Sequence, residues 1–349
     1  MTVSDASLAQ TRLQWPQRPY AVEPATAADL RAPLPPNALC QIAYGGPPVD
    51  ADPRRAIAPL QPLHGARAGE LWLSPTPVRH GRDGRFGFAE NDQVMMLHLQ
   101  IPEAEMPLLE DATRGVYAEL AERIAAHGYP HLLRVWNYLG DINQGSGDAE
   151  RYRQFCVGRF AAVAAHPGFE SQLPAASAIG SRGGEGLSLI ALASRQPGIQ
   201  VENPRQVSAF RYPRTYGVRS PSFSRACLLP WDNGAELLVS GTASIVGHAT
   251  AHAGDAIAQL GQTAANLESL RAHAMLMRAQ AGTPIAELRP HLYLLYLRHA
   301  EQLPELLPEI ARLFGDAPLQ VLIGDICRSE LLLEVEAIYR SAQTEATAC

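Results

Sequence analysis

Two glutamates near the end of the chain stand on an otherwise apolar segment. The stretch LLLEVEAIY carries Glu334 and Glu336 two residues apart. Alternate side chains of a β-strand point to the same face, which places the two carboxyl groups about 6.5–7 Å apart on one face. A carboxylate on an apolar strand is costly unless it is solvated, paired or used in chemistry. From these residues alone, the simplest interpretation is that this face looks at water. If Glu334 is instead buried, its pKa rises and it can serve as a general acid, whereas Glu336 is interpreted as the solvated end, with a second active-site carboxylate as the alternative.

A second group of side chains suits the binding of anions. The stretch FRYPRTYGVRSPSFSR contains four arginines and two tyrosines, namely Arg211, Arg214, Arg219, Arg225, Tyr212 and Tyr216. Guanidinium groups bind carboxylates through two parallel hydrogen bonds. Prolines within the stretch favour an irregular, rigid loop. The pattern therefore predicts a ligand-binding loop, and a solvated surface loop is the alternative for any single arginine.

The composition excludes several kinds of chemistry. The chain has 349 residues, 46% hydrophobic and 18% charged, which is typical of a globular protein with about two domains. All 29 basic residues are arginines, which excludes a lysine Schiff base, lysine-anchored pyridoxal phosphate and the lysine of a P-loop. The net charge of −6, without any basic run, argues against nucleic acid or an anionic membrane surface as partner. We predict no cofactor.

Cysteine and histidine spacing gives no sign of a metal or a disulfide framework. The five cysteines are Cys40, Cys156, Cys227, Cys327 and Cys349. They are odd in number and form no CxxC, which predicts a reducing compartment. The pair His248 and His252 falls in a predicted loop and has no further ligand nearby in sequence. The absence of an apolar leader or a segment of about 18 apolar residues predicts a cytoplasmic protein.

The order of predicted elements repeats. Helix periodicity over 111–128, a strand over 131–139, a helix over 150–166 that stops at Pro167-Gly168, and strands over 175–181 and 187–194 make the first unit. Helix 255–276, strand 291–300, helix 301–315 and two closing strands joined by a turn at Arg328-Ser329 make the second. This order predicts an α+β fold in which helices pack on one face of each sheet. The predicted domains are residues 1–70, 71–200 and 201–349, the first being an irregular wrapping segment with one strand near 38–45.

The second unit resembles a known superfamily. The stretch LVSGTASIVGHATAHAGDAIAQLGQTAANLESLRAHA and the closing LLLEVEAIY are similar to RidA/YjgF proteins, over about 205–340 and more weakly over 75–195. The resemblance implies two RidA-like, chorismate-mutase-like αβ units, each a mixed sheet with helices on one face. Superfamily members that hydrolyse imines carry an arginine where this chain has Pro318 and Leu319. A RidA-type imine or enamine hydrolase is therefore an alternative that lacks its carboxylate anchor.

Four longer stretches carry a narrower resemblance. ERYRQFCVGR, FRYPRTYGVRSPSFSRA, VSGTASIVGH and GDICRSELLLEVEAIY occur in this order over about 190 residues and are similar to the chorismatases, which remove pyruvate from chorismate. Within that family the chain most resembles the bifunctional chorismatases of xanthomonads, which form 3- and 4-hydroxybenzoate for a pigment pathway. A non-catalytic RidA-like protein that binds aromatic acids is a further alternative.

The resemblance also implies roles for particular residues. The small-molecule substrate would be chorismate, and Glu334 would protonate its vinyl CH₂ to start cleavage of the enolpyruvyl ether. The expected substrate-binding residues are Arg159, Tyr212, Tyr216, Arg219, Arg225, Ala243 and Cys327. Of these, Ala243 and Cys327 are expected to line the pocket and to influence which hydroxybenzoate forms. RidA proteins are trimers, so a chain with two units is expected to be a monomer or a homotrimer.

Overall fold

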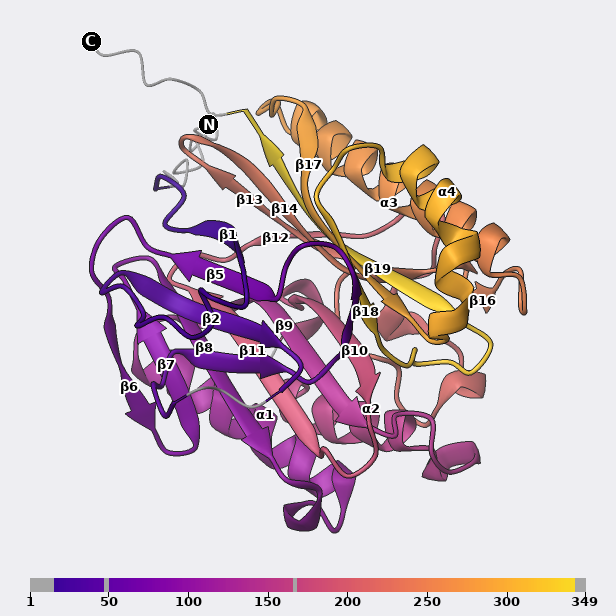
Figure 1. The fold of residues 1–349 in the computed structure, drawn as a ribbon, viewed down its shortest axis with the longest axis horizontal. Coiled ribbons are helices and arrows are strands. Elements are labelled where there is room, and N and C mark those ends of the chain that lie inside the picture. Colours follow the sequence, from indigo (N-terminus) through magenta and orange to yellow (C-terminus); the bar gives the residue numbers. More distant parts are fainter. Residues whose placement is uncertain (1–15, 47–49, 166–167, 343–349) are drawn as a thin grey trace, which may run out of the picture.

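Residues 16–46, 50–165 and 168–342 are described by the structure, a computed structural model in which three sheets surround one interior (Figure 1). The first large sheet has the order β10-β9-β11-β8-β7-β6. Its strands are β6 (Arg79–Asp83), β7 (Phe86–Glu90), β8 (Val94–Ile101), β9 (His131–Gly140), β10 (Ala175–Ser181) and β11 (Leu187–Ser194). Helices α1 (Leu109–Ala126) and α2 (Arg151–Val163) pack on this sheet.

The second large sheet has the order β12-β13-β14-β19-β17-β18-β4. Its strands are β4 (Pro62–His64), β12 (Ile199–Val201), β13 (Ala226–Trp231), β14 (Gly234–Ala243), β17 (Leu288–Leu297), β18 (Leu319–Ile323) and β19 (Leu333–Ser341). Helices α3 (Ala256–Gln280) and α4 (Leu303–Phe314) cover its outer face (Figure 1). A short hairpin of β15 (Ile245–Val246) and β16 (Ala249–Thr250) follows β14. None of the helices in the described ranges is long and apolar enough to cross a membrane.

The two large sheets repeat one topology. The run β10-β9-β11-β8-β7 matches β18-β17-β19-β14-β13, and in each the first pair is parallel and the others antiparallel. The predicted α+β architecture and its four helices are therefore confirmed. The predicted turn at Arg328-Ser329 lies between the two closing strands, but these strands do not pair with each other, because β17 lies between β18 and β19. Helix α4 is the crossover that a parallel β17–β18 pair requires, and the chain must then pass β17 to reach its free side.

Alternation along β19 separates the helix-covered face from the inner face. Leu333, Val335 and Ala337 pack with α3 and α4, whereas Glu334 and Glu336 face the first sheet. Both carboxyl groups therefore lie in the seam between the two large sheets.

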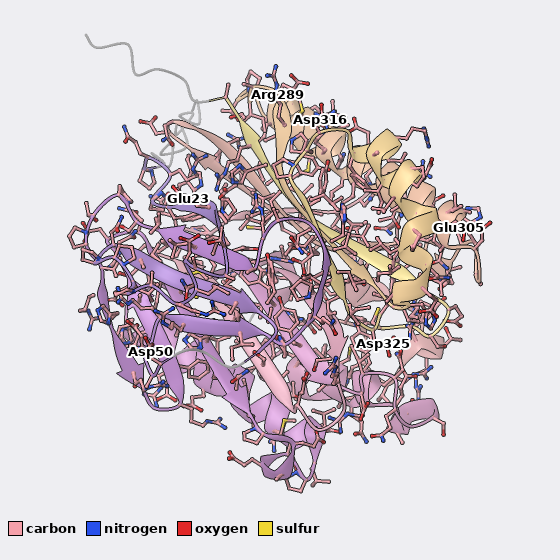
Figure 2. The ribbon with its side chains drawn as sticks, viewed as in Figure 1. Glu23, Asp50, Arg289, Glu305, Asp316 and Asp325 are labelled. Carbon is pink, nitrogen blue, oxygen red and sulfur yellow. The ribbon has the colours of Figure 1, made fainter. Side chains whose placement is uncertain are left out.

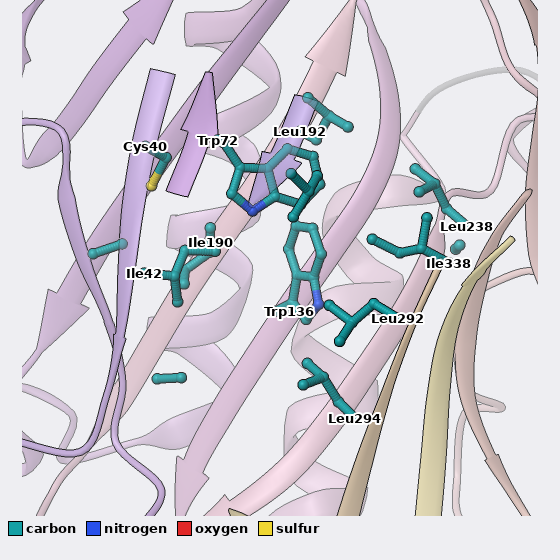
Figure 3. Packing of buried hydrophobic residues seen from close by; sticks show 14 of the residues in the cluster. Cys40, Ile42, Trp72, Trp136, Ile190, Leu192, Leu238, Leu292, Leu294 and Ile338 are labelled. Carbon is teal, nitrogen blue, oxygen red and sulfur yellow. The ribbon is translucent and has the colours of Figure 1, made fainter. Parts of the chain in front are cut away.

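The N-terminal region is more regular than the sequence predicts. Strands β1 (Ala21–Ala25), β2 (Ala38–Tyr44), β3 (Arg55–Ala58) and β5 (Gly69–Leu73) form a third sheet with the order β1-β5-β2-β3. Only the strand at 38–45 was expected. Trp72 of β5 meets Trp136 of β9 edge to face, 5.8 Å between ring centroids, in a core that also holds Leu238 and Ile338 of the second sheet (Figure 3). The third sheet thus fills one end of the seam.

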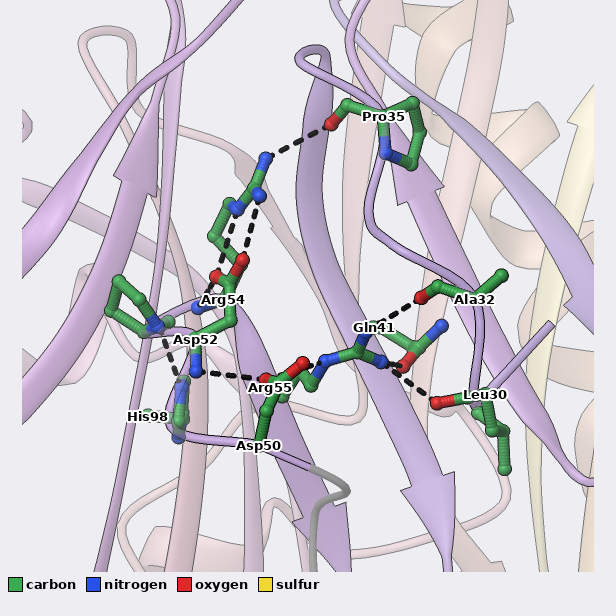
Figure 4. A network of polar contacts seen from close by, with 10 residues as sticks. Leu30, Ala32, Pro35, Gln41, Asp50, Asp52, Arg54, Arg55 and His98 are labelled. Carbon is green, nitrogen blue, oxygen red and sulfur yellow. Dashed lines mark hydrogen bonds and ion pairs between the residues drawn. The ribbon is translucent and has the colours of Figure 1, made fainter.

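Polar side chains fasten this third sheet. Arg55 is buried and donates to the carbonyl oxygens of Leu30 and Ala32 at 2.8 and 2.7 Å, and to Gln41 and Asp50 (Figure 4). At the far end, Tyr20 donates to buried Glu236, which also pairs with Arg340 at 2.7 Å. Some predictions fall outside the described residues. They concern residues 1–15, Pro167, Cys349 and the end of the C-terminal domain at 343–349.

Helices α1 and α2 touch at a glycine, which gives a first prediction. A Cβ added to Gly158 of α2 would meet the backbone oxygen of Glu110 at 2.2 Å, whereas one added to Gly115 of α1 meets nothing within 4 Å. We expect Gly158→Ala to lower the free energy of unfolding by about 1–3 kcal/mol through overpacking. The matched control Gly115→Ala should raise it by about 0.5–1 kcal/mol. Chemical denaturation of both variants checks this, and equal effects would contradict the close helix contact.

Candidate active site

A cavity of about 230 Å³ opens in the seam, at the end that the third sheet leaves free. Its walls come from α2, from edge strand β10, from the inner face of β14 and β19, and from the segments 212–225 and 327–330. Seven of the eight predicted site residues line it, namely Arg159, Tyr212, Tyr216, Arg225, Ala243, Cys327 and Glu334. The two halves of the chain therefore build one site together.

Glu334 lies at the floor of this cavity and is 5% exposed. Its carboxyl group rests over the backbone of Gly241, where a Cβ would come within 1.7 Å of Glu334 Oε1. The pairing of β14 with β19 shifts register between Val239 and Thr242, and this bulge turns Gly241 toward the carboxyl group. A side chain at position 241 would therefore displace the Glu334 carboxyl group from this place.

The surroundings of Glu334 favour its protonated form. Burial raises the pKa of Glu334 to about 8, and the nearby charge of Glu336 adds to the rise. The guanidinium groups of Arg134 and Arg225 act in the opposite direction and lower this pKa in part. At neutral pH Glu334 is therefore mostly a carboxylic acid that can give up a proton.

The β14 bulge also joins the two halves of the chain. The Ser240 hydroxyl donates to Ser224 O at 2.5 Å and accepts from the backbone N–H of Ala176 at 2.8 Å. Isolated bridges hold β10 at both ends, Ala175 to Ser224 and Gly180 to Asp325. Asp325 is labelled in Figure 2 at this junction. Between the two bridges, β10 faces the cavity.

Two buried arginines on opposite walls carry charge that no carboxylate neutralises directly. Arg159 is 4% exposed, and its guanidinium carbon lies 4.9 Å from the centroid of the Tyr117 ring. Arg225 is 3% exposed and donates to Tyr212 Oη at 2.6 Å and to Val207 O at 3.1 Å. Neither forms an ion pair in the described part of the chain, and both Nε atoms are buried without a hydrogen-bond partner there. Such guanidinium groups are ready to receive an anion.

Arg328 supplies a third guanidinium group at the cavity, although the sequence predicts only a turn at this position. Its guanidinium carbon lies 3.8 Å from the ring centroid of Tyr216 and 5.1 Å from that of Tyr212. Nη1 donates to His248 O at 2.9 Å, while Nη2 is buried and has no partner among the described residues. The two predicted tyrosines thus hold this arginine in place by cation–π contact.

The segment that carries Arg328 and Cys327 is held from inside the fold. Arg298 donates to the carbonyl oxygens of Ile326, Arg328 and Leu331 at 2.8–3.0 Å. Burial raises the pKa of the Cys327 thiol to about 12, and the charge of Glu334 adds to the rise. The Cys327 thiol therefore lines the cavity as an uncharged group.

The structure places two residues differently from the expectation. Arg219 lies outside the cavity lining, because its side chain is exposed and its guanidinium carbon stacks 4.4 Å from the centroid of the Phe160 ring. Glu336 is not solvated but 4% exposed, and its Oε2 lies 2.8 Å from Arg134 Nη2. The residues in the described ranges contain no group of three or more side chains arranged to hold a metal ion.

The fold and the cavity define an α+β protein in which a buried carboxylic acid lies between two large sheets. The family described as chorismatase FkbO/Hyg5-like, N-terminal, matches residues 70–193. A 3-hydroxybenzoate synthase of Streptomyces hygroscopicus is 36% identical over 282 residues, which are 77% of this chain and 80% of that protein. A chorismatase of Streptomyces rapamycinicus is 35% identical over 280 residues, covering 77% and 81%.

A solved structure supports the same assignment. The crystal structure of a chorismatase matches with a TM-score of 0.80 and 29% identity, covering 91% of this chain and 98% of that one. The chain belongs to the chorismatase family and is an enzyme.

The raised pKa of Glu334 predicts a pH-dependent stability. Because the folded protein holds this proton more tightly than the unfolded chain, the contribution is full below about pH 4.5 and is lost as pH rises through about 8. We expect the free energy of unfolding of Glu334→Gln, relative to the parent, to rise by up to about 1.4 kcal/mol per pH unit over that window. Denaturation at several pH values measures it. The exposed Glu330→Gln serves as control, and a pH-independent difference for Glu334→Gln would contradict the prediction.

Proposed function

We propose that this protein cleaves the enolpyruvyl ether of chorismate to pyruvate and a hydroxybenzoate. The observation that carries the proposal is the buried carboxylic acid of Glu334, set in a cavity with the unpaired guanidinium atoms of Arg159, Arg225 and Arg328. Chorismate is a dianion with an acid-sensitive vinyl ether, so it needs both features. The names of the relatives, chorismatase and 3-hydroxybenzoate synthase, support the same substrate.

The chemistry begins with proton transfer to carbon. The Glu334 carboxyl group gives its proton to the vinyl CH₂, which becomes a methyl group, and the ether-bearing carbon becomes an oxocarbenium centre. Breaking the bond between the ring carbon and the ether oxygen then releases pyruvate, which keeps that oxygen as its carbonyl oxygen, and leaves positive charge on the ring. Loss of one ring proton, which returns to Glu334, makes the ring an aromatic hydroxybenzoate, directly or after the neighbouring ring hydroxyl has bonded to the charged carbon. Together pyruvate and hydroxybenzoate contain the same atoms as chorismate, so the balance needs no oxidant, reductant or net water. Capture of the oxocarbenium carbon by water would instead break its own bond to the ether oxygen and give pyruvate and a dihydrodiol, with one water consumed.

Substrate orientation follows from the placement of the cations. Arg225 and Arg328 lie on the side of the arginine-tyrosine loop, and Arg159 lies on α2 across the cavity. We assign the two substrate carboxylates to these two sides, with Tyr212 as a further hydrogen-bond donor. This arrangement holds the vinyl group over Glu334, between the two halves of the chain.

Small residues around the acid are proposed to decide the product. Ala243 pairs with Glu334 across β14 and β19, and Cys327 contributes a neutral thiol to the same cavity. We propose 3-hydroxybenzoate, 4-hydroxybenzoate or both as the aromatic product, as in the bifunctional chorismatases of pigment formation. We also propose a cytoplasmic protein that is a monomer or a homotrimer. Chromatography of the aromatic products from one reaction distinguishes the possibilities.

The proposed activity is tested by following pyruvate after adding chorismate. We expect release by the parent and a fall in kcat of about 10²- to 10⁴-fold in Glu334→Gln, because the proton donor is lost. For the parent, kcat/KM should be highest below about pH 8 and should fall as pH rises further, since only the protonated form acts. Binding of chorismate without pyruvate would instead favour the non-catalytic alternative, and full turnover by Glu334→Gln would exclude Glu334 as the acid.

The arginine placement gives a paired prediction. Arg328→Gln removes a guanidinium at the cavity, and we expect KM for chorismate to rise about 10- to 100-fold, since a charge-assisted hydrogen bond is worth about 1.5–3 kcal/mol. Arg219→Gln removes a guanidinium of the same loop outside the cavity and should leave KM within about twofold. Initial-rate kinetics of both variants measures the two KM values. A larger rise in KM for Arg219→Gln than for Arg328→Gln would contradict the position of Arg328 at the cavity and of Arg219 outside it.

A further inference from the structure

Glu336 is a buried acid beside the site that the proposed chemistry leaves without a role. Its Oε2 accepts from Trp136 Nε1 at 2.9 Å and lies 2.8 Å from Arg134 Nη2. Arg134 is 2% exposed and reaches it from β9 of the first sheet. A buried pair of this kind does little for stability compared with apolar residues of similar size, because both ions lose their hydration. Its position therefore calls for a functional explanation.

Through a serine, the pair reaches the glycine on which the catalytic carboxyl group rests. Arg134 Nη2 also donates to Ser177 Oγ at 2.7 Å, and the backbone N–H of Gly241 donates to the same oxygen at 2.9 Å. A Cβ on Gly241 would meet Glu334 Oε1 at 1.7 Å and Ser177 Oγ at 3.2 Å, so both side chains lie against the same point of the β14 bulge. Ser177 Oγ accepts both hydrogen bonds, so its own proton is free for another acceptor, and Ser177 lines the cavity.

We infer that the Arg134–Glu336 pair, acting through Ser177, positions Glu334 and sets the pH range over which Glu334 holds its proton. The inference rests on the proposed function and deepens it. Arg134 and Glu336 are positioning residues, because neither lines the cavity. Glu336 opposes a second negative charge on its own strand face and keeps the acid protonated. Once the proton has left, Arg134 and Ser177 stabilise the Glu334 carboxylate.

Other charged and titratable groups also face these carboxyl groups. Around Glu334 they are Arg225 from the loop before β13, Tyr152 from α2 and Cys327 from the segment before β19. Around Glu336 they are Glu70 from β5, Tyr138 from β9 and Tyr296 from β17. Burial raises the pKa of Glu70 and of both these tyrosines, so the tyrosines stay neutral near pH 8. Arg134 and Glu336 are thus the two groups whose exchange for neutral residues changes the field at Glu334 without altering the cavity wall.

The test compares single and double variants. Glu336→Gln leaves Arg134 unbalanced, and we expect the alkaline fall of kcat/KM to move down by about one pH unit or more. Arg134→Met combined with Glu336→Gln removes both charges, and the fall should return to within about half a unit of the parent's position or above it. A purely structural role predicts that the double variant is at least as impaired as the single one.

A control and a second readout make every outcome decisive. Glu236→Gln removes the other buried acid of this sheet, paired with Arg340 about 20 Å away along β19, and should leave the pH profile in place. Infrared difference titration of each protein against its Glu334→Gln counterpart reports the pKa of Glu334 without substrate. A downward shift there in Glu336→Gln, restored in the double variant, supports the inference even if chorismate is not turned over. An unshifted titration in a folded Glu336→Gln, or a downward shift that the folded double variant keeps, overturns it, whereas missing pyruvate release by the parent overturns only the proposed function.

Discussion

The site depends on one contact. The carboxyl group of Glu334 rests on the backbone of Gly241, inside the seam between the two large sheets. The contact needs a residue without a side chain, a bulge that turns it toward the acid, and a second sheet that excludes water from above. Each requirement involves another part of the chain. Ser240 fixes the bulge, the bridges at both ends of β10 fix the second sheet, and the third sheet keeps the far end of the seam closed. A carboxylic acid that stays protonated near neutral pH is the result.

The repeated topology explains why one chain contains one such site. By strand order, β11 corresponds to β19, and it presents Ser188, Ile190 and Leu192 to the interior where β19 presents its two glutamates. The first half therefore brings no second acid. It supplies the opposite wall instead, through α2 and β10, together with Arg134 on β9. The two similar units therefore differ in what they contribute. The second unit supplies the acid, and the first unit supplies the opposite wall of the cavity and a charged residue close to the acid.

Sequence periodicity predicts the helices, the repeat and the common strand face of Glu334 and Glu336, because these depend on local spacing, whereas the active role of Glu334 is implied by the family resemblance. It fails where partners come from distant parts of the chain. Glu336 reads as a solvated residue until Arg134, about 200 positions earlier, is found beside it. Arg328 reads as a turn residue because its stacking on Tyr216 is a tertiary contact, and Arg219 matches the motif but points away from the cavity. The order of the closing strands also depends on β17 lying between them, which no local signal encodes.

The charges around the cavity fit a reaction in which Glu334 begins neutral and ends as an anion beside a positively charged substrate carbon. Before binding, buried guanidinium groups without carboxylate partners stand opposite an acid that burial keeps neutral. In the proposed reaction, a dianionic substrate would neutralise those cations, so Glu334 would lose opposing positive charge and hold its proton more firmly until it meets the vinyl carbon. Proton transfer would then leave an anion on Glu334 directly beside the positive carbon it has created. That ion pair forms in a site of low dielectric, where preorganised groups stabilise charge more strongly than water does.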